Sequence, residues 1–278
     1  MSYKTILVHL NDRRRAEALL EPAIHLANQF NSHLIGLHVY ASMPAPPIAV
    51  PFASRVLGGI VATERKDSEE IEAIFARMTA NRPFVAEWRA RKIPHVDLAG
   101  IVLAHGRSAD LIVAGQTDTE WDLSPLMDFP ERLALESGRP VLVVPYVGRY
   151  AVVGNNVTIA WKNTRESARA TFDALPILTR AKSVQILEIT ERGGESAAAS
   201  PDTSIAAALA RHGIKPVLRS SVAGEISVGD EILSRLADDG ADLLVMGAYG
   251  HSRMREMVFG GATRHIARHM TAPTLFSH

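Results

Sequence analysis

The sequence predicts an α/β protein of two repeated, doubly wound domains, each with a parallel sheet of about five strands. Two observations lead to this prediction. Short continuous apolar runs alternate with amphipathic helical patterns, which is typical of strands buried on both faces of a parallel sheet. The same order of elements also occurs twice, first in residues 1–147 and again in residues 154–278. An internal repeat of this kind indicates two copies of one domain.

The repeat is visible in paired segments that follow one another in the same order in both halves. KTILVHLNDRRRAEALLEPAIHLA (4–27) resembles NVTIAWKNTRESARATFDALPILT (156–179), and each contains a strand, a polar turn and a helix. The remaining pairs are HLIGLHVYA (33–41) with SVQILEITE (183–191), SADLIVAGQT (108–117) with GADLLVMGAY (240–249), and SGRPVLVVPY (137–146) with MTAPTLFSH (270–278). Residues 146–155 are the expected linker.

Helical patterns separate the predicted strands. The predicted helices cover residues 67–81, 95–105, 164–180, 202–212 and 228–239. Because parallel strands need right-handed crossovers, these helices are expected to cover both faces of each sheet.

The composition excludes several classes of protein. The 278 residues are 47% hydrophobic and 22% charged, as in ordinary soluble domains. Thirty basic and thirty acidic side chains cancel, so no general attraction to nucleic acid or to an anionic membrane is expected. The apolar runs are too short for a membrane span or a signal peptide. Together with the absence of cysteine, this favours a cytoplasmic protein.

The stretch GAYGHSRMREMVFGGATRHI (247–266) carries the clearest chemical signal. It follows the apolar run ADLLVM, at a strand end where open α/β sheets bind ligands. Gly247 and Gly250 permit a sharp turn with exposed N–H groups. Gly260 and Gly261 open a helix, whose amino end attracts anions. With Arg253 and Arg255 in between, the pattern predicts a phosphate site; the alternative is a glycine-softened connection from strand to helix.

The spacing Gly247-x2-Gly250-x9-Gly260 resembles the G-2x-G-9x-G-(S/T) signature of the ATP-binding branch of the universal stress protein family. Both halves resemble its domains, and the pair resembles the bacterial tandem form. The resemblance implies the adenine nucleotide alpha hydrolase-like, Rossmann-like fold. It also implies that the second half binds ATP or another adenine nucleotide, with Mg²⁺ as an accompanying ion. Finally, it implies an intramolecular pseudo-dimer through the last strands of the two halves, and leaves a homodimer of chains open.

The resemblance assigns a set of nucleotide-binding residues in the second half. Ala160 and Trp161 end the first strand, and Ile189 falls where the family packs an aliphatic residue on adenine. Lys162 stands where the family usually has a carboxylate for the ribose hydroxyls. The complete set is Ala160, Trp161, Lys162, Ile189, Met246, Gly247, Gly250, Gly260, Gly261 and Thr263.

The sequence departs from the family pattern around the phosphates and in the first half. Gly261 replaces the expected Ser or Thr, while Thr263 matches a second hydroxyl position. The first half has Asn11 in place of the carboxylate and lacks the second and third glycines after Gly115. Its acidic side chains there would repel phosphate: Asp118, Glu120, Asp122 and Asp128. We therefore expect the first half to be a partner domain without nucleotide.

No residue is predicted to be catalytic. The P-loop and GxSxG motifs are missing from the sequence, so P-loop hydrolase and α/β-hydrolase chemistry lack their core motifs. No residue supplies a general base for a γ-phosphate, so any ATP hydrolysis should be slow. His265 and His269 share one helix face, but no local carboxylate or cysteine completes a metal site, and no metal is predicted.

The expected function is a binding and regulatory module of the stress response. Two alternatives stay open. One is an ATP-using enzyme of the same fold group. The other is a protein without nucleotide that acts through the apolar segment ASMPAPPIAVPFASRVLGG (41–59), which suits a lid or a partner surface.

Overall fold

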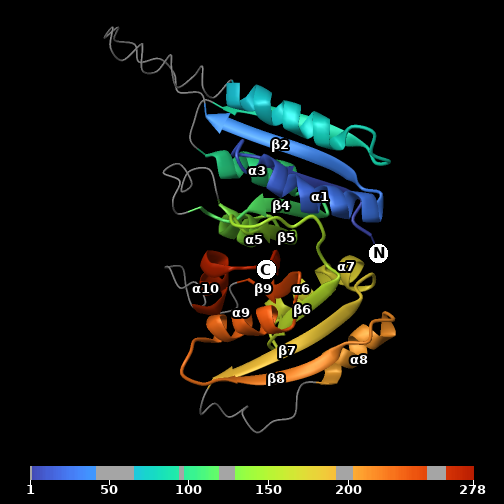
Figure 1. The fold of residues 1–278 in the computed structure, drawn as a ribbon, viewed down its shortest axis with the longest axis vertical. Coiled ribbons are helices and arrows are strands. Elements are labelled where there is room, and N and C mark those ends of the chain that lie inside the picture. The colour runs from blue at the N-terminus through green and yellow to red at the C-terminus, as the bar shows by residue number, and fades with distance from the viewer. Residues whose placement is uncertain (1, 42–65, 94–96, 119–128, 192–202, 249–260) are drawn as a thin grey trace, which may run out of the picture.

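The computed structural model describes residues 2–41, 66–93, 97–118, 129–191, 203–248 and 261–278. Figure 1 shows helices on both faces of one continuous sheet. The strands are β1 (Thr5–His9), β2 (His33–Ala41), β3 (Ala86–Ile93), β4 (Leu111–Gly115), β5 (Val141–Val144), β6 (Asn156–Trp161), β7 (Ser183–Glu191), β8 (Val217–Ala223), β9 (Leu243–Gly247) and β10 (Thr274–Ser277).

The helices alternate with these strands. They are α1 (Ala16–Phe30), α3 (Leu98–Gly106), α5 (Pro130–Glu136), α6 (Arg165–Asp173), α7 (Leu175–Leu178), α8 (Thr203–Arg211), α9 (Val228–Asp238) and α10 (Gly261–His269). A further helix runs through residues 66–79.

The ten strands follow the order β3-β2-β1-β4-β5-β10-β9-β6-β7-β8. Within each half all neighbours are parallel, and the chain reverses its direction of winding between the first strand and the fourth. This is the doubly wound topology predicted from the sequence. It places one switch point between β1 and β4 and its counterpart between β6 and β9.

The two halves join through their last strands. β5 and β10 pair antiparallel, with Leu142 opposite Leu275 and Val141 opposite Phe276. The prediction that VLVVPY and PTLFSH meet is therefore confirmed. Other contacts between the halves support this junction: the Tyr3 hydroxyl donates to the Asp173 carbonyl at 2.7 Å.

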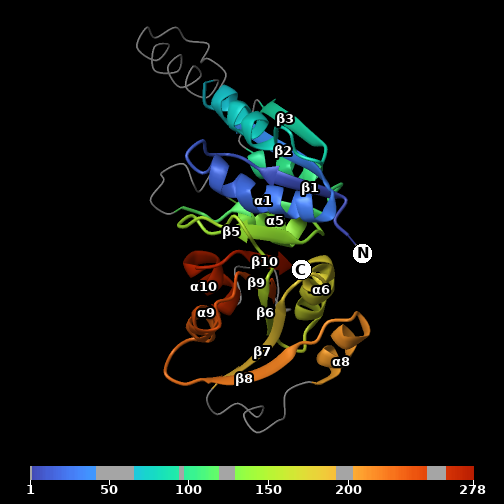
Figure 2. The same cartoon turned by 45° about the vertical axis from the view of Figure 1, so that its right-hand side comes forward.

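Two apolar cores cover the two faces of the sheet and run through both halves. One lies beneath α1, α6, α7, α8 and the helix through 66–79. The other lies beneath α3, α5, α9 and α10. Figure 2, turned from the first view, separates α6 and α8 from α9 and α10 on opposite sides of the second half of the sheet.

The strand register corrects the sequence match by one residue. His33 and Ser183 begin the equivalent strands β2 and β7, and they pair with Thr5 and Asn156. The sequence match had instead set Lys4 against Asn156. One residue decides which side chain enters which core, because successive strand side chains point to opposite faces.

Several element boundaries differ from those predicted. The predicted helix over 164–180 is divided into α6 and α7, because Pro176 in the first turn of α7 cannot continue the hydrogen bonding of α6. The edge strands β3 and β8 were not located in the sequence. They contain polar residues at many positions, unlike the continuous apolar runs of the inner strands. The predicted linker, residues 146–155, contains neither helix nor strand.

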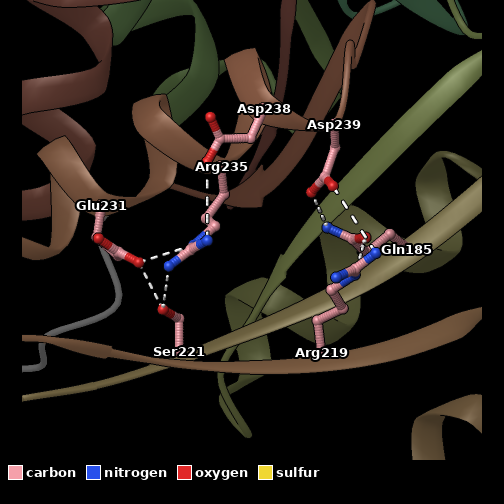
Figure 3. A network of polar contacts seen from close by, with 7 residues as sticks. All are labelled: Gln185, Arg219, Ser221, Glu231, Arg235, Asp238 and Asp239. Carbon is pink, nitrogen blue, oxygen red and sulfur yellow. Dashed lines mark hydrogen bonds and ion pairs between the residues drawn. The ribbon is translucent and has the colours of Figure 1, made fainter.

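A polar network fixes α9 on the edge of the second half (Figure 3). The Ser221 hydroxyl donates to Glu231 Oε1 at 2.5 Å, and Arg235 Nε donates to the same oxygen at 2.8 Å. Arg219 Nε and Gln185 Oε1 are 2.9 Å apart, and Gln185 in turn donates to the Asp239 carboxylate. Side chains of β7 and β8 thus hold α9 by hydrogen bonds as well as by its apolar face.

Candidate functional site

The carboxyl ends of β6 and β9 meet at the switch point of the second half. Ala160 pairs with Met246, and Gly247 pairs with Ser277 of β10. Lys162 follows β6 directly. Most of the residues predicted from the first strand and the glycine stretch therefore lie at the carboxyl ends of neighbouring strands. Ligands of open α/β sheets bind at such strand ends.

Strand alternation separates the predicted residues between the two faces. Ala160, Ile189 and Met246 belong to the core beneath α9 and α10. Trp161 belongs to the opposite core, where it is 8% exposed. Its buried Nε1 atom has no hydrogen-bond partner in the described part of the chain. The structure thus groups Ala160, Ile189 and Met246 and places the Trp161 side chain apart from them.

Gly247 lies against the backbone of α6. A Cβ atom built on Gly247 would stand 2.5 Å from the Glu166 carbonyl carbon and 2.6 Å from the Ser167 nitrogen. These distances are too short for any side chain, so this position requires glycine. The amino end of α6, capped by the Thr164 side chain, is consequently held against the end of β9. The first helix of the half thus brings the positive end of its dipole to the site, a feature that the sequence analysis missed.

Glu166 is a second residue that the sequence analysis missed. Its side chain is buried in the first turn of α6. Burial opposes ionisation, but hydrogen bonds from its own backbone and from Arg165 outweigh it and hold the pKa of this carboxyl below its usual value. A carboxylate next to Gly247 limits how much negative charge this side of the site can accept.

Lys162 is exposed at the end of β6. Its carbonyl accepts a hydrogen bond from the Thr164 nitrogen at 2.6 Å. The strand register makes Lys162 the counterpart of Asn11, as the family resemblance had set them, and Asn11 is 6% exposed. Both halves therefore lack a carboxylate at the position where the family resemblance expects one.

The helix α10 begins at Gly261, as predicted. Gly261 is exposed, and a Cβ atom there would meet no described residue within 4 Å. Thr263, in the same turn, is buried at 6% exposure. Gly250 and Gly260, together with the two arginines between them, lie outside the described residues. The same holds for residues 42–59 of the apolar segment and for most of the acidic stretch after Gly115.

The first half fills the corresponding space with its own side chains. By the corrected register His9 replaces Ala160, and its ring lies 5.1 Å from that of Phe129. His9 is 3% exposed, and burial together with the charge of His38 lowers its pKa to about 3. A neutral aromatic pair therefore stands beside the strand end.

Arg15 fills the space next to Gly115, the counterpart of Gly247. A Cβ atom on Gly115 would lie 2.7 Å from the Arg15 guanidinium. Arg15 is 8% exposed, and its guanidinium donates to the carbonyl of Gln116 at 2.7 Å. The first-half position is thus occupied by a side chain, whereas in the second half Gly247 meets helix backbone.

The two histidines of α10 have partners within the protein. His265 Nε2 lies 2.8 Å from Asp230 Oδ1 on α9, and His269 Nδ1 lies 3.0 Å from the His265 carbonyl. Gly229 on α9 lets the His265 ring approach closely, since an added Cβ atom would meet it at 2.6 Å. Among the described residues no group of three His, Asp or Glu side chains converges on a metal position. The contacts of His265 fasten α10 to α9, whereas that of His269 stays within α10.

The described helices are also too short or too polar to cross a membrane. The fold and the strand-end site together define a tandem α/β protein of the Rossmann-like class. A sequence profile of the Universal stress protein family matches residues 2–145 and 165–278, so the chain belongs to this family.

Individual proteins agree with this assignment. Universal stress protein Slr1230 of Synechocystis is 44% identical over 54 residues, a match that spans 18% of this chain and 19% of that protein. A universal stress protein from Archaeoglobus fulgidus superposes with a TM-score of 0.67 at 14% identity, covering 98% of this chain and 95% of its own. Protein PA1789 from Pseudomonas aeruginosa PAO1 gives 0.60 at 14% identity, with 99% and 92% covered. At these identities the two structures establish the fold alone.

Proposed function

We propose that this chain is an adenine-nucleotide-binding regulatory module of the stress response, with ATP bound in the second of two domains, 154–278. The first domain, 1–147, serves as a partner without nucleotide. The observation that carries the proposal is the arrangement at the end of β9. Gly247 sits at the switch point, the amino end of α6 packs on it, and the glycine stretch leads into α10.

The chemistry of these groups suits a nucleotide. The amino end of α10 offers N–H donors and positive potential to a polyphosphate, and the dipole of α6 adds positive potential. Ala160, Ile189 and Met246 form an apolar surface on one face, which suits a purine ring. In the first half His9, Phe129 and Arg15 occupy the equivalent space, which supports a single site for the whole chain.

Titration calorimetry tests the proposal. ATP, ADP and AMP are titrated into the whole protein, with and without Mg²⁺, at one salt concentration. Gly250→Val should weaken ATP binding, because a β-branched side chain obstructs positive φ and close approach of phosphate. Mass spectrometry of molecules released by heat from the purified protein provides an independent test. If there is no heat of binding and no released nucleotide, the proposal fails. The alternative then is that the chain acts through residues 41–59.

A further inference from the structure

Gln116 links the first half to the helix that opens the proposed site. It follows Gly115 at the end of β4 and is 1% exposed. Its side-chain nitrogen donates to the carbonyls of Ala267 at 3.0 Å and Arg268 at 2.9 Å. Both carbonyls belong to the last turn of α10, where a helix has no intrahelical donors left for them. A residue of one half thus caps a helix of the other.

The Gln116 side chain is itself held rigidly. Its Oε1 atom accepts from the Tyr146 nitrogen at 3.1 Å, and its backbone nitrogen donates to Val144 at 2.8 Å. Its carbonyl accepts from Arg15, which fills the first-half counterpart of the site. Every polar group of Gln116 is therefore engaged, so its amide cannot turn away from α10 without losing hydrogen bonds in the first half.

The first half caps a helix of the second half, but the equivalent position of the second half provides no such cap in return. The counterpart of Gln116 in the second half is Ala248, because Gly115 and Gly247 occupy equivalent positions in β4 and β9. A methyl group cannot donate a hydrogen bond, so Ala248 offers no such cap to α5. The half without a nucleotide motif thus stabilises the helix of the half that has one.

We infer that Gln116 is a positioning residue of the nucleotide site: it fixes α10 so that the amino end of this helix stays in place for phosphate. This inference rests on the proposed function. α10 is held by its apolar face, which includes the buried Ile266, by the His265–Asp230 contact to α9 and by the Gln116 cap. Without the cap, α10 should sample other orientations. The apparent affinity for ATP is then reduced in proportion to the fraction of molecules that keep the binding orientation.

The test uses the full chain and the variants Gln116→Met and Gln185→Met. The second is a matched control, because Gln185 also donates a hydrogen bond, to Asp239, but at the far end of α9. ATP affinity is measured by calorimetry well below the unfolding temperature, and amide hydrogen exchange is followed in α10. We expect Gln116→Met to weaken ATP binding by at least about fivefold, the lower end of typical coupling between sites. It should also speed exchange in α10, while Gln185→Met changes neither.

The outcomes separate the inference from the proposed function. Unchanged affinity in Gln116→Met, or an equal loss in both variants, overturns the positioning role. If the unmodified protein binds no adenine nucleotide, the proposed function fails. In that case amide hydrogen exchange of the nucleotide-free proteins tests Gln116. Unaltered exchange of α10 in Gln116→Met overturns its positioning role.

Discussion

Leu142 and Leu275 face each other at the centre of the sheet, and they are equivalent residues of the repeat. Each stands two positions after the proline that precedes its strand, Pro140 and Pro273, and each is fully buried. An equivalent pair in an antiparallel ladder marks the position of an approximate twofold axis between the halves. The junction is thus symmetric at its centre, although the two strand-end sites differ.

Replacing Leu275 tests how much this junction contributes to stability. Leu275→Ala should lower the free energy of unfolding by about 2–5 kcal/mol, because it leaves a cavity between two close-packed strands. Val85→Ala is a suitable control, since Val85 is 64% exposed and should change stability by about 0.5 kcal/mol or less. Urea denaturation measures both. Equal small effects would mean that the halves do not depend on this contact.

Adding a side chain at Gly247 and at Gly261 should have different effects on stability. Gly247→Ala should destabilise the protein by about 1–3 kcal/mol, because its Cβ atom would overlap the backbone of α6. Gly261→Ser should leave stability within about 0.5 kcal/mol, since its Cβ atom contacts none of the residues that the structure describes.

The Gly261→Ser variant also restores the hydroxyl expected by the family resemblance. A hydrogen bond to a charged group contributes about 1.5–3 kcal/mol, so ATP should bind at least about tenfold more tightly. Thermal unfolding and calorimetry provide both readouts. A stable Gly247→Ala protein with normal ATP affinity would contradict the close packing of β9 on α6.

His9 predicts a loss of stability in mild acid. Its pKa in the folded protein is lowered to about 3, first by burial and then by the charge of His38. The unfolded chain takes up a proton near pH 6.5 but the folded one does not. The stability contribution is therefore complete above this pH and is lost as the pH falls toward 3, by about 1.4 kcal/mol per pH unit.

Removing the titrating ring isolates this effect. His9→Phe keeps an aromatic ring against Phe129 and should flatten the decline in unfolding free energy between about pH 6.5 and 4. The two proteins should show parallel curves above pH 7, where His9 is neutral in both states. Parallel curves over the whole range would show that His9 is not held neutral by the fold.

The inner strands and the repeat could be predicted because each strand is a short run of apolar residues. The β1 segment TILVH, for example, is buried almost throughout. The edge strands β3 and β8 could not, since one side of each has no strand partner among the described residues and polar residues are tolerated there. The register of β1 followed only partly from the sequence, since the segment match sets Lys4 against Asn156 whereas the motif match already sets Asn11 against Lys162.

The candidate site was predictable only where a pattern is local. Gly247 and Gly261 lie in one short stretch of sequence, so their spacing can be recognised from the sequence alone. The occupation of the first-half space by His9 and Arg15 depends on side chains that meet Phe129 and Gly115 across the fold. The contact of Gln116 with α10 joins residues about 150 positions apart. Such contacts depend on how distant elements pack together, and the periodicity of the sequence carries no information about that packing.

Lys162 provides the sharpest test of how the nucleotide lies. With the ribose at the end of β6, Lys162→Asp restores an ionised acceptor for its hydroxyls. ATP should then bind about ten- to a hundredfold more tightly. The exposed Lys182, at the opposite end of the strands, allows a control: Lys182→Asp changes the net charge equally but should leave affinity unchanged. Calorimetry at one salt concentration compares the three proteins. Weaker binding by Lys162→Asp alone would place a phosphate, rather than the ribose, beside residue 162.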